Sequence, residues 1–190
     1  MTYYRLIVVL SLLLALASCS TRQVREDFAG STEQRLTSHS INQIMEKLPE
    51  EDFVFLADQP VFLECFFLKE IEPLAYARRR LEMTLLEKYR CRLMSDPAEA
   101  KFVLTVFFTS IGTDFDKTGI STPDLVLPGM GGPMSIDILA LEMYHGITEF
   151  YYYIRDADNR VVVRGEMLKK VVRNDTLLLP LITIPINTMR

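Results

Sequence analysis

The chain has 190 residues and a formal net charge of −4, from 21 basic and 25 acidic side chains. Nucleic-acid-binding domains usually carry a clustered basic surface, so this charge balance argues against nucleic acid as a partner. The densest basic cluster, Arg78–Arg80 followed by Arg90 and Arg92, is predicted to be the solvent-facing side of one helix. The length is sufficient for one domain with its own hydrophobic core.

The first residues have the layout of a secretory signal. Arg5 supplies a positive charge, the run Leu6–Leu16 is almost wholly apolar, and the small residues Ala17 and Ser18 follow. A short basic region, an apolar core of about ten residues and a small-residue exit are typical of a signal that is cleaved. A membrane-spanning helix needs about 20 apolar residues, so we expect residues 1–18 to be removed as a signal peptide.

The end of this signal, Leu16-Ala17-Ser18-Cys19, resembles the lipobox of bacterial lipoproteins. The resemblance implies that the Cys19 thiol carries diacylglycerol, that cleavage precedes it, and that the new amine is acylated. Two or three acyl chains anchor a protein stably, whereas one chain binds a membrane only marginally. The residue after the cysteine is Ser20 and not the aspartate that retains many such lipoproteins in the inner membrane. The resemblance therefore favours an outer-membrane location in which the protein faces the periplasm. The alternative is an ordinary signal peptide with a chance cysteine.

After the signal, residues 19–31 are polar and are predicted to form a tether, and a helix is predicted over 31–48. The helix prediction depends on large apolar residues that recur at helical spacing, namely Leu36, Ile41, Ile44, Met45 and Leu48. A strand is predicted over 61–68, a nearly continuous apolar run in which alternate residues share a face. A second helix is predicted from Pro73 to about Leu93, because proline is favoured in a first helical turn.

A further strand is predicted over 100–111. The segment 112–133 contains five glycines and three prolines and is expected to be an irregular loop, which in a compact domain is usually functional or mobile. Residues 134–144 fit a strand or a helix equally well. A β-hairpin is predicted over 146–172, around the turn residues Asp156-Ala157-Asp158-Asn159.

This order of elements predicts a single α+β domain over 32–190, facing the periplasm. Its expected architecture is a mostly antiparallel sheet with two helices packed on one face and a C-terminal β-hairpin. Such a domain loosely resembles the small α/β domains of envelope lipoproteins, such as the curli-secretion lipoprotein.

Catalytic and phosphate-binding motifs are missing from the sequence. It has two histidines, His39 and His145, and no HExxH, GxSxG or CxxC pattern. The glycine-rich Gly129–Gly132 is not followed by the lysine of a phosphate loop, so a flexible loop is expected there. Asp114 and Asp116 do not fit a calcium-loop spacing and are interpreted as solvated acids at a strand end. We expect no metal and no cofactor.

Glu64 and two cysteines stand out in otherwise apolar segments. A carboxylate in the strand 61–68 needs a partner, such as a helix arginine, or a place at a strand edge, and a catalytic acid is the alternative. Cys65 and Cys91 would both lie in the oxidising periplasm, so either a disulfide or two free buried thiols is consistent with the sequence.

Two apolar segments are candidates for a partner surface. The run Phe150–Tyr153 places aromatic rings on both faces of a strand, so one face could form a partner surface or an ordinary cross-strand ladder. The tail 177–186 could be a final strand or a docking strand, and its candidate partner residues are Leu177, Leu179, Leu181 and Ile184.

The leading hypothesis is a non-enzymatic lipoprotein that binds another protein of the cell envelope, with the 112–133 loop and the 177–186 tail as its two candidate interaction surfaces. A lipoprotein that binds a lipid or glycan in a cleft under the 112–133 loop is the first alternative. An envelope hydrolase is the second, because single carboxylates can act without a recognisable motif. An open apolar surface, an apolar cavity and converging carboxylates would distinguish the three.

Overall fold

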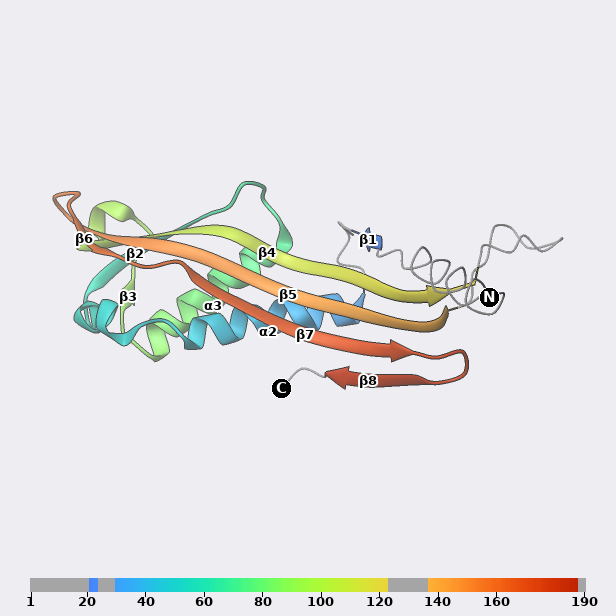
Figure 1. Cartoon of the computed structure of the whole chain (residues 1–190). Coiled ribbons are helices and arrows are strands. Elements are labelled where there is room, and N and C mark those ends of the chain that lie inside the picture. The colour runs from blue at the N-terminus through green and yellow to red at the C-terminus, as the bar shows by residue number, and fades with distance from the viewer. Residues whose placement is uncertain (1–20, 24–29, 123–136, 188–190) are drawn as a thin grey trace, which may run out of the picture. The chain divides into compact units, whose positions relative to one another are not determined.

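The computed structural model describes residues 21–23, 30–122 and 137–187 (Figure 1). They form an α+β structure with a mixed, mostly antiparallel sheet, as predicted. The strand order is β3-β2-β4-β5-β7-β8, with β1 on β4 and β6 on β5. The helices and strands are α2 (Ser31–Glu46), α3 (Glu72–Glu87), β1 (Thr21–Gln23), β2 (Pro60–Phe66), β3 (Arg92–Leu93), β4 (Phe102–Ser121), β5 (Asp137–Asp156), β6 (Val161–Arg164), β7 (Leu168–Leu178) and β8 (Thr183–Asn187).

The chain divides into two compact units. Unit 1 comprises Met1–Asp27, Asp114–His145 and Arg173–Arg190, and unit 2 comprises Phe28–Thr113 and Gly146–Val172. The predicted signal peptide, Cys19, residues 123–133 of the Gly/Pro-rich segment and residues 134–136 of the ambiguous segment lie outside the described residues.

The helix predicted over 31–48 is confirmed as α2, Ser31–Glu46. It begins after Gly30, whose backbone N–H donates to the Glu33 carboxylate at 3.1 Å, and this bond satisfies one of the free N–H groups of the first turn. The apolar residues at helical spacing are buried, as the pattern required: Leu36, Ile41, Ile44 and Met45. Pro49 follows the helix, where it costs no helical hydrogen bond.

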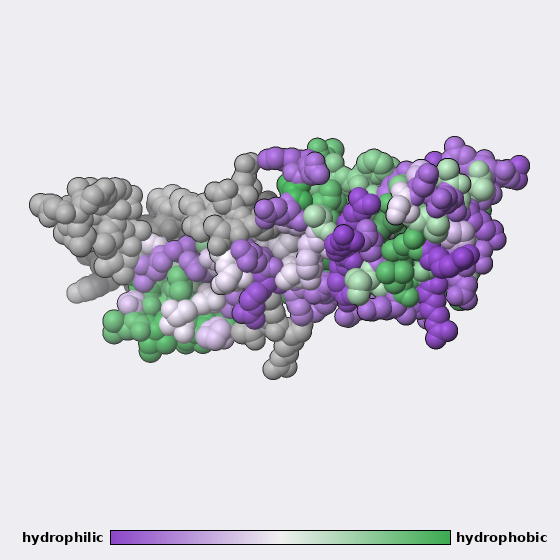
Figure 2. All heavy atoms as spheres, turned by 180° about the vertical axis from the view of Figure 1, so that it is seen from behind, coloured by the Kyte–Doolittle hydropathy of each residue, from purple (hydrophilic) through white to green (hydrophobic). Residues whose placement is uncertain are grey.

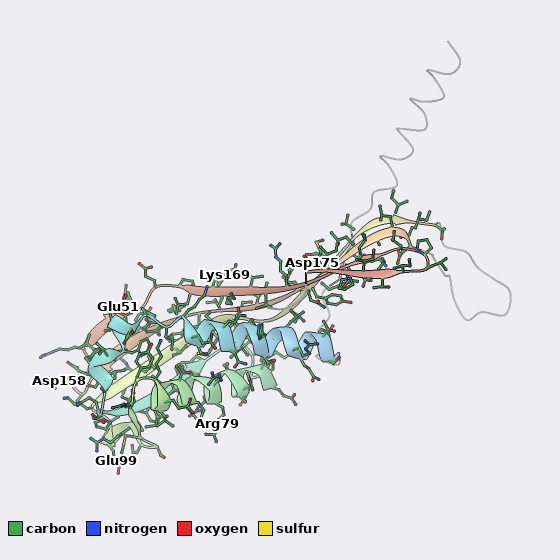
Figure 3. The ribbon with its side chains drawn as sticks, turned by 90° about the horizontal axis from the view of Figure 1, so that it is seen from below. Glu51, Arg79, Glu99, Asp158, Lys169 and Asp175 are labelled. Carbon is green, nitrogen blue, oxygen red and sulfur yellow. The ribbon has the colours of Figure 1, made fainter. Side chains whose placement is uncertain are left out.

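The second predicted helix exists as α3, Glu72–Glu87, but its predicted end near residue 93 is wrong. The chain leaves the helix through Arg90, which has a positive φ of 55°. The Cys91 N–H donates to the Leu85 carbonyl, and residues 92–93 form β3, which pairs parallel with β2. Arg90 and Arg92 are therefore not on this helix, whereas the Arg79 side chain is 83% exposed and points outward (Figure 3).

One hydrophobic cluster makes the core of unit 2. Alternate residues of three neighbouring strands are buried in it: Val61 and Leu63 of β2, Leu104, Val106 and Phe108 of β4, and Phe150, Tyr152 and Ile154 of β5. Helix α2 lies directly against β5 at Gly146, because a Cβ built there would be 2.4 Å from the Leu36 carbonyl oxygen. The Tyr152 hydroxyl donates to the Asp52 carboxylate at 2.6 Å, which gives this buried ring a polar partner.

The expectation of an irregular segment from residue 112 is wrong for its described part, since β4 runs without interruption to Ser121. Two of the five glycines that led to that expectation, Gly112 and Gly119, lie inside the strand. A Cβ added to Gly112 would have no atom within 4 Å, so there is open space for a side chain at this position. At Gly119 a Cβ would be 2.3 Å from the Leu139 carbonyl oxygen, so glycine permits a close approach of β4 and β5.

The ambiguous segment before residue 146 is a strand from Asp137 onward, so β5 has 20 residues. The turn after it forms as predicted: the Asn159 N–H donates to the Asp156 carbonyl, and Asn159 has a φ of 64°. The single return strand predicted over 160–172 is wrong. The chain forms the short β6 on β5, is interrupted at Gly165, and resumes as β7. A Cβ at Gly165 would be 2.2 Å from the Tyr152 ring, so the interruption accommodates that buried ring.

Candidate binding surface

The face of the unit 2 sheet that points away from the core carries a row of aromatic side chains. In the parallel pairing of β2 with β4, Glu64 lies beside Thr105 and Phe66 beside Phe107. Because side chains alternate along a strand, these residues point away from the buried set that contains Leu63 and Val106. The rings of β2, β4 and β5 on this side are called the aromatic face: Phe66, Phe107, Tyr151 and Tyr153.

The rings of the aromatic face contact one another in sequence across the strands. Phe66 and Phe107 stack with centroids 5.3 Å apart and planes at 20°, and Phe107 and Tyr151 stack at 5.3 Å and 16°. Tyr153 meets both Phe107 and Tyr151 edge-on. The Arg164 guanidinium lies 5.3 Å from the Tyr153 ring centroid, a cation–π contact. The central ring, Phe107, therefore has neighbours on both sides, and Phe66 is 48% exposed at the end of the row.

A polar group borders the aromatic face. The Glu64 carboxylate accepts hydrogen bonds from the Thr105 hydroxyl at 3.0 Å and from Arg155 Nη2 at 3.3 Å. Arg155 Nη1 also donates to the Asn159 side chain at 2.6 Å. Glu64 thus has the partner that its apolar strand required, but the arginine comes from β5 and not from a helix. Glu64 is ion-paired with Arg155, and of the described residues that line this place it is the only carboxylate.

The aromatic and polar side chains line a hollow of about 430 Å³ that is open to solvent. That volume lies within the range of small-molecule sites. Its lining residues are Glu64, Phe66, Thr105, Phe107, Tyr153, Arg155, Val161 and Arg164. Val161 is 52% exposed at the rim, and its neighbour Val162, which does not line the hollow, is 46% exposed.

Among the residues that the structure describes, neither histidine has a carboxylate oxygen within hydrogen-bond distance. His145 Nδ1 lies 3.9 Å from Asp116 Oδ2 in unit 1, and His39 Nε2 in unit 2 contacts the Gln43 amide at 2.8 Å. Asp114 and Asp116 are inside β4, so their predicted place at a strand end is wrong. Across the described ranges, no group of three His, Cys, Asp or Glu side chains is arranged to hold a metal ion.

Cys65 and Cys91 are both free thiols in unit 2. Burial raises the pKa of the Cys65 thiol to about 12 and that of the Cys91 thiol to about 11. The thiolate is the reactive form of cysteine, so these pKa values make both side chains chemically inert near neutral pH. Neither thiol is a candidate nucleophile.

The tail residues named as a candidate partner surface lie in unit 1. Leu177 of β7 pairs with Ile184 of β8, so the tail contains strands, and Leu181 at the turn between them is 96% exposed. Leu177 and Leu179 are half-buried.

The sequence predicted a candidate surface at the aromatic run of β5, but it did not indicate the neighbouring Phe66 and Phe107 or the two arginines. Only the strand register brings these side chains together.

In the part of the chain that the structure describes, no helix is both long and apolar enough to cross a membrane. No protein-family model matches the sequence, and no curated protein matches it either.

Proposed function

We propose that this protein is a bacterial lipoprotein, anchored through lipid on Cys19, that binds another envelope protein and has no enzymatic role. The lipobox-like Leu16-Ala17-Ser18-Cys19 supports the anchor, and Ser20 supports an outer-membrane location facing the periplasm. In this proposal the helices α2 and α3 cover one face of the sheet, and the C-terminal part of the domain forms a β-hairpin. The opposite face is left open for the partner.

The observation that carries the binding proposal is the aromatic face of unit 2. Buried aromatic residues and arginine are enriched at the centres of protein–protein interfaces, and this face presents four rings with Arg155 and Arg164 at its border. The rings are held by contacts with one another, so little side-chain entropy remains to be lost when a partner covers them. The face therefore has the composition and the rigidity of an interface.

The ring geometry favours a protein over a glycan. A sugar binds aromatic residues by stacking its C–H groups on an open ring face. Here the faces of Phe107 are directed at Phe66 and Tyr151, and Arg164 lies over Tyr153. The central ring therefore offers no open face to a sugar, and the surface that remains, with Phe66 exposed at its end, suits the apolar side chains of a protein partner.

The hollow supports a second candidate, a small ligand held between Val161 and the Glu64–Arg155 pair. Its volume of about 430 Å³ and its mixed apolar and polar lining are typical of ligand sites. A ligand would compete with a protein partner for the same surface. The size of the molecule that crosslinks to this surface therefore separates the two functions.

The interface is tested by placing a photo-crosslinking amino acid at Phe66 in cells with an intact envelope. The matched control is the same group at Met83, which is 44% exposed on α3. We expect one discrete protein adduct at position 66 and none at 83. Val161→Lys should weaken that adduct, and Val162→Lys on the other side of β6 should leave it unchanged. Adducts of equal strength at both positions, or none at 66, would refute a protein partner on this face, and a small adduct at 66 would favour the ligand.

The anchor is tested separately. Cys19→Ala should block lipidation and move the protein out of the membrane fraction, and mass spectrometry of the wild-type N-terminal peptide should find fatty acids on Cys19. A mature chain that begins elsewhere, or that carries no fatty acid, would contradict the anchor and leave the interface experiment unaffected.

A further inference from the structure

Unit 1 has a concentration of exposed apolar side chains at one end of its strands. We call this group the apolar end: Ile120, Ile138, Leu139, Leu181 and Ile182, whose exposed fractions range from 38% to 96%. Figure 2 shows hydrophobic residues gathered on the surface in this region. The sequence from Thr176 to Asn187 contains no charged residue. An apolar surface of this kind marks a place that is covered by protein or lipid in the working state.

The five residues come from three places in the chain that meet at the same end of the unit. Ile120 is near the end of β4 and Ile138 is near the start of β5, and the two strand ends are joined by a hydrogen bond from Ser121 to Asp137 at 2.8 Å. The turn between β7 and β8, which carries Leu181 and Ile182, lies beside the same strand ends (Figure 1).

The direction of the N-terminal strand β1 relates the predicted lipid attachment point to that end. In the antiparallel pairing of β1 with β4, Thr21 lies beside Lys117 and Gln23 beside Phe115. Followed back toward the N-terminus, β1 therefore points at Thr21 in the direction in which β4 runs, toward Ser121. Cys19 is two residues away, a span of at most about 7 Å. A lipid on Cys19 would therefore hold the part of unit 1 around residues 117–121 near the bilayer.

We propose that the apolar end inserts into the boundary between lipid headgroups and acyl chains, as a second contact with the membrane that carries the anchor. This inference rests on the proposed lipidation of Cys19, which fixes the bilayer as the occupant. Leu181 projects almost free of protein neighbours, which suits entry into a fluid phase better than docking on a rigid protein surface. An inserted apolar surface adds binding strength in proportion to the area it buries.

The test places an environment-sensitive fluorophore at Leu181→Cys in the full-length lipoprotein, reconstituted in vesicles of phosphatidylethanolamine and phosphatidylglycerol. Leu68→Cys is the matched control, because Leu68 is 98% exposed in unit 2. Both positions are fully exposed, so neither change removes a packing contact. The protonated thiols of Cys65 and Cys91 label slowly, and in the lipoprotein the lipid blocks Cys19, so the introduced cysteine is the reactive one.

We expect the emission from position 181 to shift to the blue in vesicles and to be quenched by nitroxides on the acyl chains. Emission from position 68 should stay sensitive to a water-soluble quencher. Equal exposure of both labels to water would overturn the insertion. Burial of the label at 181 without vesicles, accompanied by dimerisation, would also overturn it in favour of a second copy of the chain.

The two proposals fail in different ways. A fatty acid on Cys19 with a water-exposed label at 181 would refute insertion alone. If Cys19 is unmodified, and a label at Leu181→Cys in the Cys19→Ala variant still enters the bilayer, the anchor is refuted and the apolar end is the principal membrane contact.

Discussion

The close contact between α2 and β5 makes Gly146 a sensitive position. A Cβ at Gly146 would lie 2.4 Å from the Leu36 carbonyl oxygen and 2.6 Å from its carbonyl carbon. Both atoms belong to the helix backbone, and Leu36 is completely buried, so no flexible side chain can move aside. Gly146→Ala therefore forces the helix away from the strand. Overpacking a well-packed core costs about 1–3 kcal/mol, and a backbone obstacle places this change near the upper limit.

Alanine also restricts the unfolded chain relative to glycine, which stabilises a protein by about 0.4–1 kcal/mol where the backbone permits it. The expected net loss for Gly146→Ala is then about 2 kcal/mol. Gly112→Ala is the matched control, because a Cβ there meets no atom within 4 Å and only the stabilising effect remains. The assay is urea unfolding of the two variants, with the slope of the transition compared to confirm that the unfolded state is unchanged. Equal transition midpoints for the two variants would refute the contact between α2 and β5.

Two further predictions concern the core of unit 2. Tyr152→Phe removes a 2.6 Å hydrogen bond to the Asp52 carboxylate and should lower the free energy of unfolding by about 2 kcal/mol; an unchanged urea midpoint would contradict this. Burial raises the thiol pKa of Cys65 from 9.0 to about 12. The stabilisation that the buried, protonated thiol contributes is therefore complete below pH 9 and is lost as the pH rises toward 12. Cys65→Ala should therefore reduce the alkaline loss of stability, and alkylation of Cys65 at neutral pH should require unfolding.

The elements that could be predicted from the sequence are those with a local cause. The helical spacing of apolar residues such as Leu36 and Ile41 predicts α2. The apolar run around Leu63, in which alternate residues share a face, predicts β2. The turn at Asp156 and Asn159 uses residues that form turns by their own side chains and by positive φ. In each case the signal lies within a few residues, so no knowledge of the tertiary structure was needed.

The errors arise where tertiary contacts override local preference. Gly112 and Gly119 indicate a loop by composition, but β5 supplies the partner that keeps β4 extended. The apolar pattern of α3 continues to Tyr89, which lies beyond the end of the helix. There the Tyr89 hydroxyl donates to the Leu48 carbonyl at 3.0 Å, and its ring packs against Phe53. Periodicity shows that such a residue is buried, but not which element buries it.

The candidate surface is the clearest case in which pattern alone is insufficient. Phe66, Phe107 and Tyr151 belong to three strands that are distant in sequence, and each alone resembles an ordinary strand residue. The parallel register of β2 with β4 places Phe66 beside Phe107, and the same register places Glu64 beside Thr105, within reach of Arg155. A shift of one residue would direct Phe66 into the core and Cys65 outward, because side chains alternate. The buried residues Val61 and Leu63 resist that shift, so the packing of the core fixes which side chains the aromatic face presents.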